Sequence, residues 1–336
     1  MIQHELHTGP FCFEAGGRLD SIPVVYHTSG KRDGKVVWIC HALTANSDPE
    51  DWWPEMVGPG KLIDTEKYFV VCVNMLGSSY GSAGPATVNP LTGKPYFFDF
   101  PAITIRDMIQ ATELVRAHLG VEKVDLLIGS SIGGFQALEW AVSAPDLFQK
   151  AIFIATAPRI SPWLAASAEA QRMALDADPT FRAAQSLQGG AEGLKCARAQ
   201  AIISYRCFAG FQHTQFEQDE DCLFSGRAAS YERYQGEKLV RRGFDAYSYW
   251  YLCQALHSHN LGRGRGGVAK ALGSIQAAST VVTIDTDNIF PPQEMDNWAP
   301  LIPGVDYRLI PSLFGHDGFL LETAALTAII EPLLCK

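Results

Sequence analysis

This 336-residue sequence lacks a long apolar run, a secretory signal and closely spaced cysteine pairs. No stretch comes near the roughly 18 uninterrupted apolar residues of a transmembrane helix, so we expect no membrane partner. The N-terminus, Met1-Ile2-Gln3-His4-Glu5, lacks a basic segment followed by an apolar one, so we expect no secretory signal. None of the eight cysteines forms a Cys-x-x-Cys pair, which indicates reduced thiols of a cytoplasmic protein rather than disulfides or a metal site.

An excess of positive charge is also missing. The chain has 27 Lys and Arg against 36 Asp and Glu, a net charge of −9, whereas nucleic-acid binders usually present a basic face. We therefore expect no nucleic-acid partner. The composition is 47% hydrophobic and 19% charged, which is enough to bury a large core and excludes a mainly disordered chain. These proportions favour a globular enzyme.

Short runs rich in β-branched and aromatic residues recur along the chain, at 36–40, 68–74, 124–128, 151–155, 280–284 and 306–310. Continuous apolar runs of this length suit strands that are buried on both faces of a parallel sheet. Helical patterns at 106–119 and 135–143 lie between them; the first follows Thr104, with Asp107 three residues on, a spacing typical of an N-terminal cap. The alternation predicts an α/β fold, and residues 11–13 and 23–27 suggest an antiparallel edge hairpin.

The strand pattern stops between about residues 161 and 267. Helical spacing replaces it at 165–175 and 195–208, and strands resume at 280. We therefore predict two parts, a core formed by residues 1–160 and 268–336 and a helical cap inserted at 161–267.

The segment Gly129-Ser130-Ser131-Ile132-Gly133 follows one predicted strand directly and precedes a predicted helix. A Gly-x-Ser-x-Gly run in this context is the nucleophile elbow of an α/β hydrolase. Ser130 is a rival hydroxyl, but the spacing places Ser131 at the elbow. The next backbone N–H, on Ile132, can donate to an oxyanion.

A serine nucleophile needs a base and an acid, which in this fold follow it along the chain. Of the nine histidines, only His316 lies beyond the last predicted strand. Asp285 and Asp287 both follow the strand at 280–284; we favour Asp287 because it lies further into the loop, and it would orient the imidazole. The second oxyanion donor is expected after an early strand, where the N–H of Leu43 is the candidate.

Many segments together resemble the homoserine O-acetyltransferase family of the α/β-hydrolase fold. They include HALT at 41–44, GPGK at 58–61, NPLTGKP at 89–95, GSSIGGFQALEW at 129–140, RYQGEKL at 233–239, GRGRGG at 262–267 and GHDGFLLE at 315–322. The resemblance implies acetyl transfer from acetyl-CoA to homoserine in methionine biosynthesis, by a ping-pong route through an acyl-serine, with no permanently bound cofactor. It also implies a homodimer formed through the helical insertion.

The family's functional residues fall on matching positions of this chain. The resemblance implies a catalytic triad of Ser131, Asp287 and His316. It places the oxyanion donors on the backbone of Leu43 and Ile132, and the substrate-binding pair on Arg206 and Asp317. Arg206 would bind the acceptor's carboxylate, which suits a guanidinium, and Asp317 its amino group. No metal is implied.

The sequence departs from the family's pattern near the expected pocket. It has Ala45-Asn46 after HALT, Ser130 before the nucleophile, an extra Gly243 and Gly77-Ser78-Ser79-Tyr80-Gly81. These differences leave serine as acceptor, succinyl-CoA as donor and ester hydrolysis as alternatives. A catalytically inactive binding protein is disfavoured because all three triad residue types are present.

Overall fold

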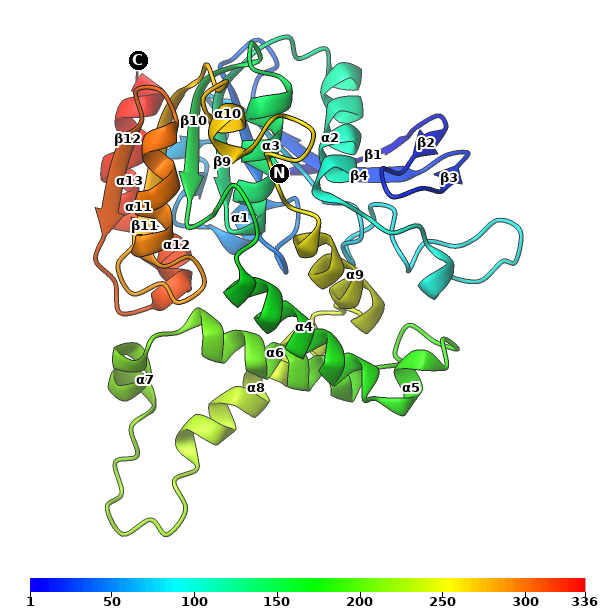
Figure 1. Cartoon of the computed structure of the whole chain (residues 1–336), viewed down its shortest axis with the longest axis vertical. Helices are drawn as coiled ribbons and strands as arrows, with labels where there is room; N and C mark the ends of the chain where they lie inside the picture. Colours follow the sequence, from blue (N-terminus) through cyan, green and yellow to red (C-terminus); the bar gives the residue numbers. More distant parts are fainter. Residues whose placement is uncertain (336) are drawn as a thin grey trace.

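The computed structural model describes residues 1–335 and is built around an eight-stranded sheet (Figure 1). Antiparallel pairing joins the first three strands at one edge, and every later neighbouring pair is parallel. The predicted, mostly parallel sheet is therefore confirmed. In spatial order the strands are β1 (Ile2–His7), β4 (Pro23–Ser29), β8 (Phe69–Val73), β5 (Val36–Cys40), β9 (Val124–Ser130), β10 (Phe148–Ile154), β11 (Ala278–Ile284) and β12 (Asp306–Ile310).

Helices cover both faces of this sheet because its central strands are apolar on both sides. In β5, Trp38 packs on the side of α2 (Ile105–Leu119) and α3 (Ile132–Ser143), whereas Ile39 packs on the side of α13 (Thr323–Cys335). The predicted cap of α2 is present: the N–H of Asp107 donates to Thr104, and the Asp107 carboxylate accepts from the N–H of Thr104. The remaining core helices are α1 (Pro49–Trp52), η1 (Phe97–Asp99), α10 (Val268–Leu272), α11 (Pro292–Trp298), η2 (Ala299–Leu301), η3 (Gly315–Asp317) and α12 (Gly318–Leu321).

The N-terminal hairpin was predicted with the wrong partners. The strand β4 pairs with β1, and β2 (Phe11–Cys12) pairs with β3 (Arg18–Leu19). A tight turn through Gly16 and Gly17, both with positive φ, closes the β2–β3 hairpin. The strand β1 escaped prediction because its sequence is largely polar and its residues are exposed or half-buried at the sheet edge. A second small pair, β6 (Val57–Gly58) with β7 (Ile63–Asp64), is parallel.

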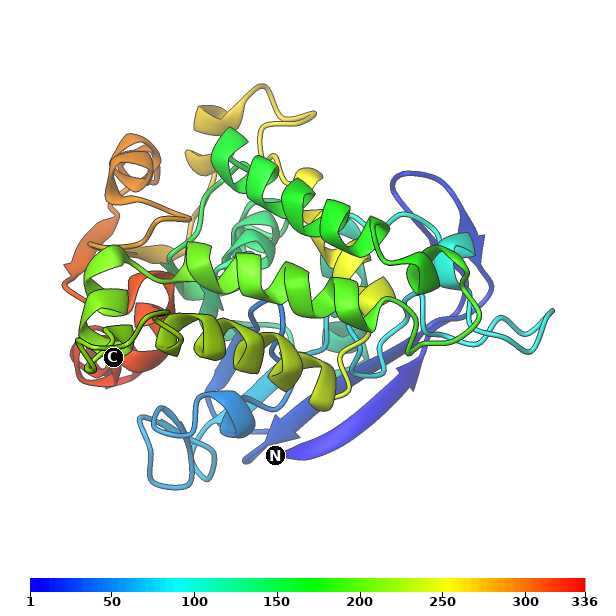
Figure 2. The same cartoon turned by 90° about the horizontal axis from the view of Figure 1, so that it is seen from below.

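Between β10 and β11 the chain leaves the sheet and forms a layer of helices against one end of it (Figure 1). Viewed from below, α6 lies between α4 and α8, side by side (Figure 2). This segment supplies α4 (Pro162–Asp176), α5 (Pro179–Arg182), α6 (Ala191–Tyr205), α7 (Phe208–Gln215), α8 (Arg227–Arg241) and α9 (Ala246–His257). We refer to residues 161–267 as the cap; its division from the core remains a prediction, and Lys336 lies outside the described residues.

Two further observations concern the described residues. None of their helices combines the length and apolarity needed to cross a bilayer. Seven cysteines are free thiols, and the side chain of the eighth, Cys335, lies outside the described part of the chain.

Candidate active site

Ser131 stands on a strained turn between β9 and α3. Its φ of 55° and ψ of −128° are unusual for a residue with a side chain and cost of order 1–3 kcal/mol. The flanking glycines are required by space, since a Cβ at Gly133 would lie 2.1 Å from the carbonyl oxygen of Cys40. A Cβ at Gly129 would lie 2.4 Å from the carbonyl oxygen of Gly133. The turn therefore has the geometry that the Gly-x-Ser-x-Gly pattern predicts.

Three predicted side chains meet at this turn. His316 Nε2 lies 2.9 Å from Ser131 Oγ, and His316 Nδ1 lies 2.7 Å from Asp287 Oδ2. The other Asp287 oxygen accepts the N–H groups of Ile289 and Phe290, at 2.7 and 3.0 Å. A carboxylate held in this way keeps a proton on Nδ1 and leaves Nε2 free to accept one from the serine.

Asp285, the alternative acid, has a different partner. Its Oδ1 accepts the N–H of Ser312 at 2.8 Å, which ties the end of β11 to the loop that carries His316. Asp285 thus contacts backbone, whereas Asp287 contacts the imidazole. Ser130, the rival hydroxyl, is buried at the end of β9.

The imidazole of His316 is enclosed by aromatic rings. Phe319, Phe290 and Tyr205 lie 5.2, 5.5 and 5.7 Å from it, centroid to centroid. Burial of this kind lowers the pKa of His316, but the charge and hydrogen bond of Asp287 outweigh it, so that the pKa is raised overall. The pair is therefore suited to hold the positive charge that forms when His316 takes a proton.

Two backbone donors point to an oxyanion hole. Within residues 1–335, neither the N–H of Leu43 nor that of Ile132 has a hydrogen-bond partner. Ile132 is the first residue of α3, where helix N–H groups are unpaired and the helix dipole favours negative charge.

His41 holds the loop that carries Leu43. Its Nε2 accepts the N–H of Met75 at 3.1 Å, so Nδ1 carries the proton and donates to the Ala42 carbonyl at 2.9 Å. Burial lowers the pKa of His41 to about 4, which keeps it neutral near pH 7. This histidine positions the loop and does not titrate with the reaction.

Arg206 and Asp317, the predicted substrate-binding pair, contact each other. Arg206 Nη1 lies 2.5 Å from Asp317 Oδ2, and Arg206 Nη2 donates to the hydroxyl of Tyr231 at 3.1 Å. Both charged side chains are about one-fifth exposed. Because Asp317 follows His316 directly, this ion pair lies beside the imidazole, where two fixed charges of opposite sign are available to a substrate.

Sequence reasoning missed several residues around the site. Thr156, just beyond β10, donates through its hydroxyl to the Ser131 carbonyl at 2.9 Å and braces the turn. Arg198 on α6 lies over the ring of Tyr205, and Glu232 on α8 lies near Arg206. Local pattern could not have found Thr156 or Glu232, because the residues they act on, Ser131 and Arg206, lie in separate parts of the chain.

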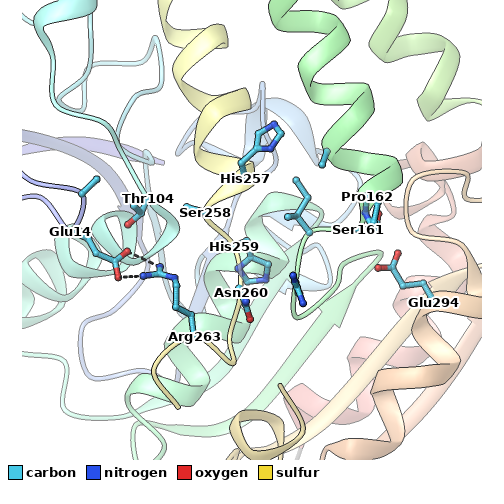
Figure 3. A pocket seen from close by; sticks show the side chains of 14 residues that line it. Glu14, Thr104, Ser161, Pro162, His257, Ser258, His259, Asn260, Arg263 and Glu294 are labelled. Atoms are coloured by element: carbon cyan, nitrogen blue, oxygen red, sulfur yellow. Dashed lines mark hydrogen bonds and ion pairs between the residues drawn. The ribbon is translucent and has the colours of Figure 1, made fainter. Parts of the chain in front are cut away.

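A pocket of about 710 Å³ opens where the cap joins the core, but neither Ser131 nor His316 lines it. Figure 3 shows Glu14 paired with Arg263 on one side of it and Glu294 on the other. The ring of Phe135 stacks 3.9 Å from His259 of the pocket and also contacts Phe290, which packs on His316. A layer of rings therefore separates this pocket from the imidazole.

A sheet of this topology, with a serine on the elbow after β9 and a histidine and a carboxylate from loops beyond β12 and β11, defines an α/β hydrolase. A family model for the alpha/beta hydrolase fold matches residues 35–323. Sequence comparison is more specific: the homoserine O-acetyltransferase of Cyclobacterium marinum is 41% identical over 321 residues, covering 95% of this chain and 91% of that protein. The chain belongs to the homoserine O-acetyltransferase family and is an enzyme of that type.

Solved structures agree on the fold. The homoserine O-acetyltransferase from Bacillus anthracis superposes with a TM-score of 0.90 at 22% identity, covering 100% of this chain and 98% of the other. Esterase E22 also superposes with a TM-score of 0.90 at 22% identity, covering 99% of both chains. One fold therefore accompanies both an acetyltransferase and an esterase, and the site has to distinguish them.

Proposed function

We propose that this enzyme transfers an acetyl group from acetyl-CoA to the side-chain hydroxyl of L-homoserine, by way of an acyl-Ser131. The observation that carries the proposal is the chain of hydrogen bonds from Ser131 through His316 to Asp287, set beside the Arg206–Asp317 ion pair. The first three residues suit acyl transfer, and the ion pair suits an amino acid as acceptor. The names of the sequence relatives support the same reaction.

The first half-reaction acylates the serine. His316 Nε2 takes the proton of Ser131 Oγ as the oxygen attacks the thioester carbonyl carbon. The N–H groups of Leu43 and Ile132 donate to the oxyanion, and Asp287 stabilises the imidazolium. The carbon–sulfur bond then breaks, coenzyme A leaves with the proton from His316, and an acetyl ester remains on Ser131.

The second half-reaction uses the same groups in reverse. The homoserine hydroxyl gives its proton to His316 Nε2 and attacks the ester carbonyl, and Ser131 recovers its proton as the acetyl group leaves. Arg206 binds the carboxylate of the acceptor and Asp317 its ammonium group, so that the zwitterion extends the existing ion pair. Both charges lie next to His316 in space or in sequence, which directs the short side chain of homoserine toward the imidazole.

Thiol release from acetyl-CoA tests the proposal directly. The wild-type enzyme is expected to release about one equivalent of coenzyme A quickly without acceptor, and to continue only when L-homoserine is added. Intact-mass spectrometry without acceptor is expected to find one acetyl group, located on Ser131 and absent from Ser131→Ala. L-Serine as a better acceptor, or succinyl-CoA as a better donor, would overturn the substrate assignment.

Ester hydrolysis is the second candidate, favoured by the likeness to esterase E22. In that reaction water would take the place of the homoserine hydroxyl at the acyl-serine. Continued thiol release at the same rate with and without L-homoserine would support the hydrolase and refute the transferase.

We further propose that the enzyme is a cytoplasmic homodimer joined through the cap. The seven free thiols support a reducing compartment. Large apolar side chains of the cap are exposed at Phe208, Phe216, Leu223 and Phe224, which supports an interface there. Light scattering at micromolar concentration tests this, since a monomeric mass would contradict it.

A further inference from the structure

The loop between β11 and α11 fixes the acid and the base of the site relative to each other. Asp285 Oδ1 accepts the N–H of Ser312 at 2.8 Å, and the hydroxyl of Thr286 donates to the Ser312 carbonyl at 2.7 Å. The next residue, Asp287, contacts His316. Three consecutive side chains of this loop therefore bind the loop that carries the histidine.

The fourth side chain in the row binds the cap instead. Asn288 Nδ2 donates to the backbone carbonyl of Arg206 at 2.8 Å. The backbone carbonyl of Asn288 in turn accepts the indole N–H of Trp163, on α4, at 2.7 Å. Asn288 is exposed, although the residues on either side of it are buried. One short loop thus connects the acid of the triad with the backbone of the arginine that contacts Asp317.

Arg206 lies at the point where the chain leaves α6. Its φ of −93° and ψ of 163° are extended, and its carbonyl bonds to Asn288 rather than within the helix. The residues on either side pack on the histidine loop: a Cβ at Gly315 would lie 2.5 Å from the carbonyl oxygen of Tyr205, and Cys207 Sγ donates to the Leu313 carbonyl at 3.2 Å. Packing holds this segment against the histidine loop, and the Asn288 bond fixes the peptide that follows Arg206.

The position of Arg206 matters because the proposed acceptor is short. Its carboxylate has to meet the guanidinium while its hydroxyl meets His316 Nε2, so the spacing between these two groups has little tolerance. A guanidinium that moved with a loosened backbone would draw the hydroxyl away from the imidazole. A loop that binds His316 through one residue and Arg206 through the next sets this spacing directly.

Resting on the proposed function, we infer that Asn288 is a positioning residue for the acceptor, which holds Arg206 at the spacing from His316 that homoserine requires. It acts through the Arg206 peptide and not on the reacting atoms. Acylation by acetyl-CoA uses Ser131 and His316 but not Arg206, so only the second half-reaction depends on Asn288.

Removal of the side-chain donor tests the inference. Asn288→Leu keeps the branched shape of the side chain and is expected to lower kcat/KM for L-homoserine about 3- to 10-fold, mainly through a higher KM. The reason is that one neutral hydrogen bond sets the fraction of molecules in which Arg206 is in place. Single-turnover release of coenzyme A from acetyl-CoA is expected to match the wild type. Asn288→Ala gives the same comparison without an added apolar side chain, should the first variant fold poorly.

The same substitution in the Arg206→Leu variant shows which group Asn288 acts through. Without the guanidinium there is nothing left to position, so Asn288→Leu is expected to cause no further loss with L-homoserine. Losses that multiply in the double variant would show that Asn288 acts on another group, and would overturn the inference.

A matched control lies on α11. Asn297 is also exposed, and its Nδ2 donates to the carbonyl of Gln293 at 2.8 Å, a bond of the same kind within one core helix. Asn297→Leu is expected to leave kcat/KM for L-homoserine unchanged, and thermal melting shows whether each variant folds. An equal loss in this control would assign the effect of Asn288→Leu to general loosening of the core.

Two further results would contradict the inference. Slower acylation in Asn288→Leu would assign the residue to the geometry of Asp287, and unchanged kinetics with L-homoserine would leave it without a role in the acceptor site. Failure of the proposed function looks different, because the wild-type acyl-enzyme would then react no faster with L-homoserine than with water, and the inference would fall with it.

Discussion

Separate substitutions of Asp287 and Asp285 test which of the two aspartates is the acid of the catalytic triad. The structure pairs Asp287 with His316, whereas Asp285 accepts a backbone N–H. Asp287 Oδ1 accepts two N–H groups, and Oδ2 contacts His316 Nδ1. In Asp287→Asn the amide oxygen is expected to keep the two N–H bonds, which leaves the NH₂ group facing Nδ1. Nδ1 then has to accept, the proton moves to Nε2, and Nε2 can no longer take the proton of Ser131.

The size of the effect follows from this change of tautomer. Loss of the correct tautomer in a serine–histidine–aspartate site costs about 10⁴-fold in turnover, or about 5.5 kcal/mol of transition-state stabilisation. Asp285→Asn provides the matched control. Its amide oxygen can still accept the N–H of Ser312, so we expect less than about a tenfold loss, the equivalent of one modest hydrogen bond.

Single-turnover release of coenzyme A from acetyl-CoA measures the step that both substitutions are meant to affect. Circular dichroism and thermal melting show whether each variant folds. A larger loss in Asp285→Asn than in Asp287→Asn, with both variants folded, would refute the assignment and move the acid to Asp285. Similar losses in both would show that the loop geometry, rather than the tautomer, sets the rate.

Three further predictions follow from the same contacts. Arg206→Leu is expected to release one equivalent of coenzyme A normally and then to transfer the acetyl group to homoserine about 10- to 150-fold more slowly, because each charge-assisted hydrogen bond contributes roughly 1.5–3 kcal/mol; normal steady-state turnover would contradict this. The acylation rate is expected to fall as the pH decreases through the raised pKa of His316, because protonated Nε2 cannot accept the serine proton; a pH–rate profile with its midpoint below the ordinary histidine value would count against it. Gly133→Ala is expected to yield little folded protein, since the new Cβ would lie 2.1 Å from the carbonyl oxygen of Cys40; a wild-type melting temperature would show that the elbow can move.

Much of the candidate site could be read from sequence because its signals are local. The elbow needs small residues at Gly129 and Gly133 and a strand and a helix on either side, and all of these lie within one short segment. Because the base follows the serine and the acid along the chain in this fold, His316 was the one candidate among the nine histidines. The apolar runs of the central strands predicted the parallel sheet for the same reason, since a strand buried on both faces is apolar at every position.

Contacts between distant segments could not be read in this way. Local pattern did not show that β1 pairs with β4, because a polar edge strand carries little hydrophobic signal and pairing depends on the partner. The choice between Asp287 and Asp285 depends on which side chain the loop turns toward the imidazole. The Arg206–Asp317 pair exists only because the cap folds over the core, which brings together two charges that lie far apart in the chain. Sequence alone determined the buried central strands, the elbow and the candidate residues, whereas tertiary packing decided which of them meet, since electrostatic and hydrogen-bond partners are set by distances in space.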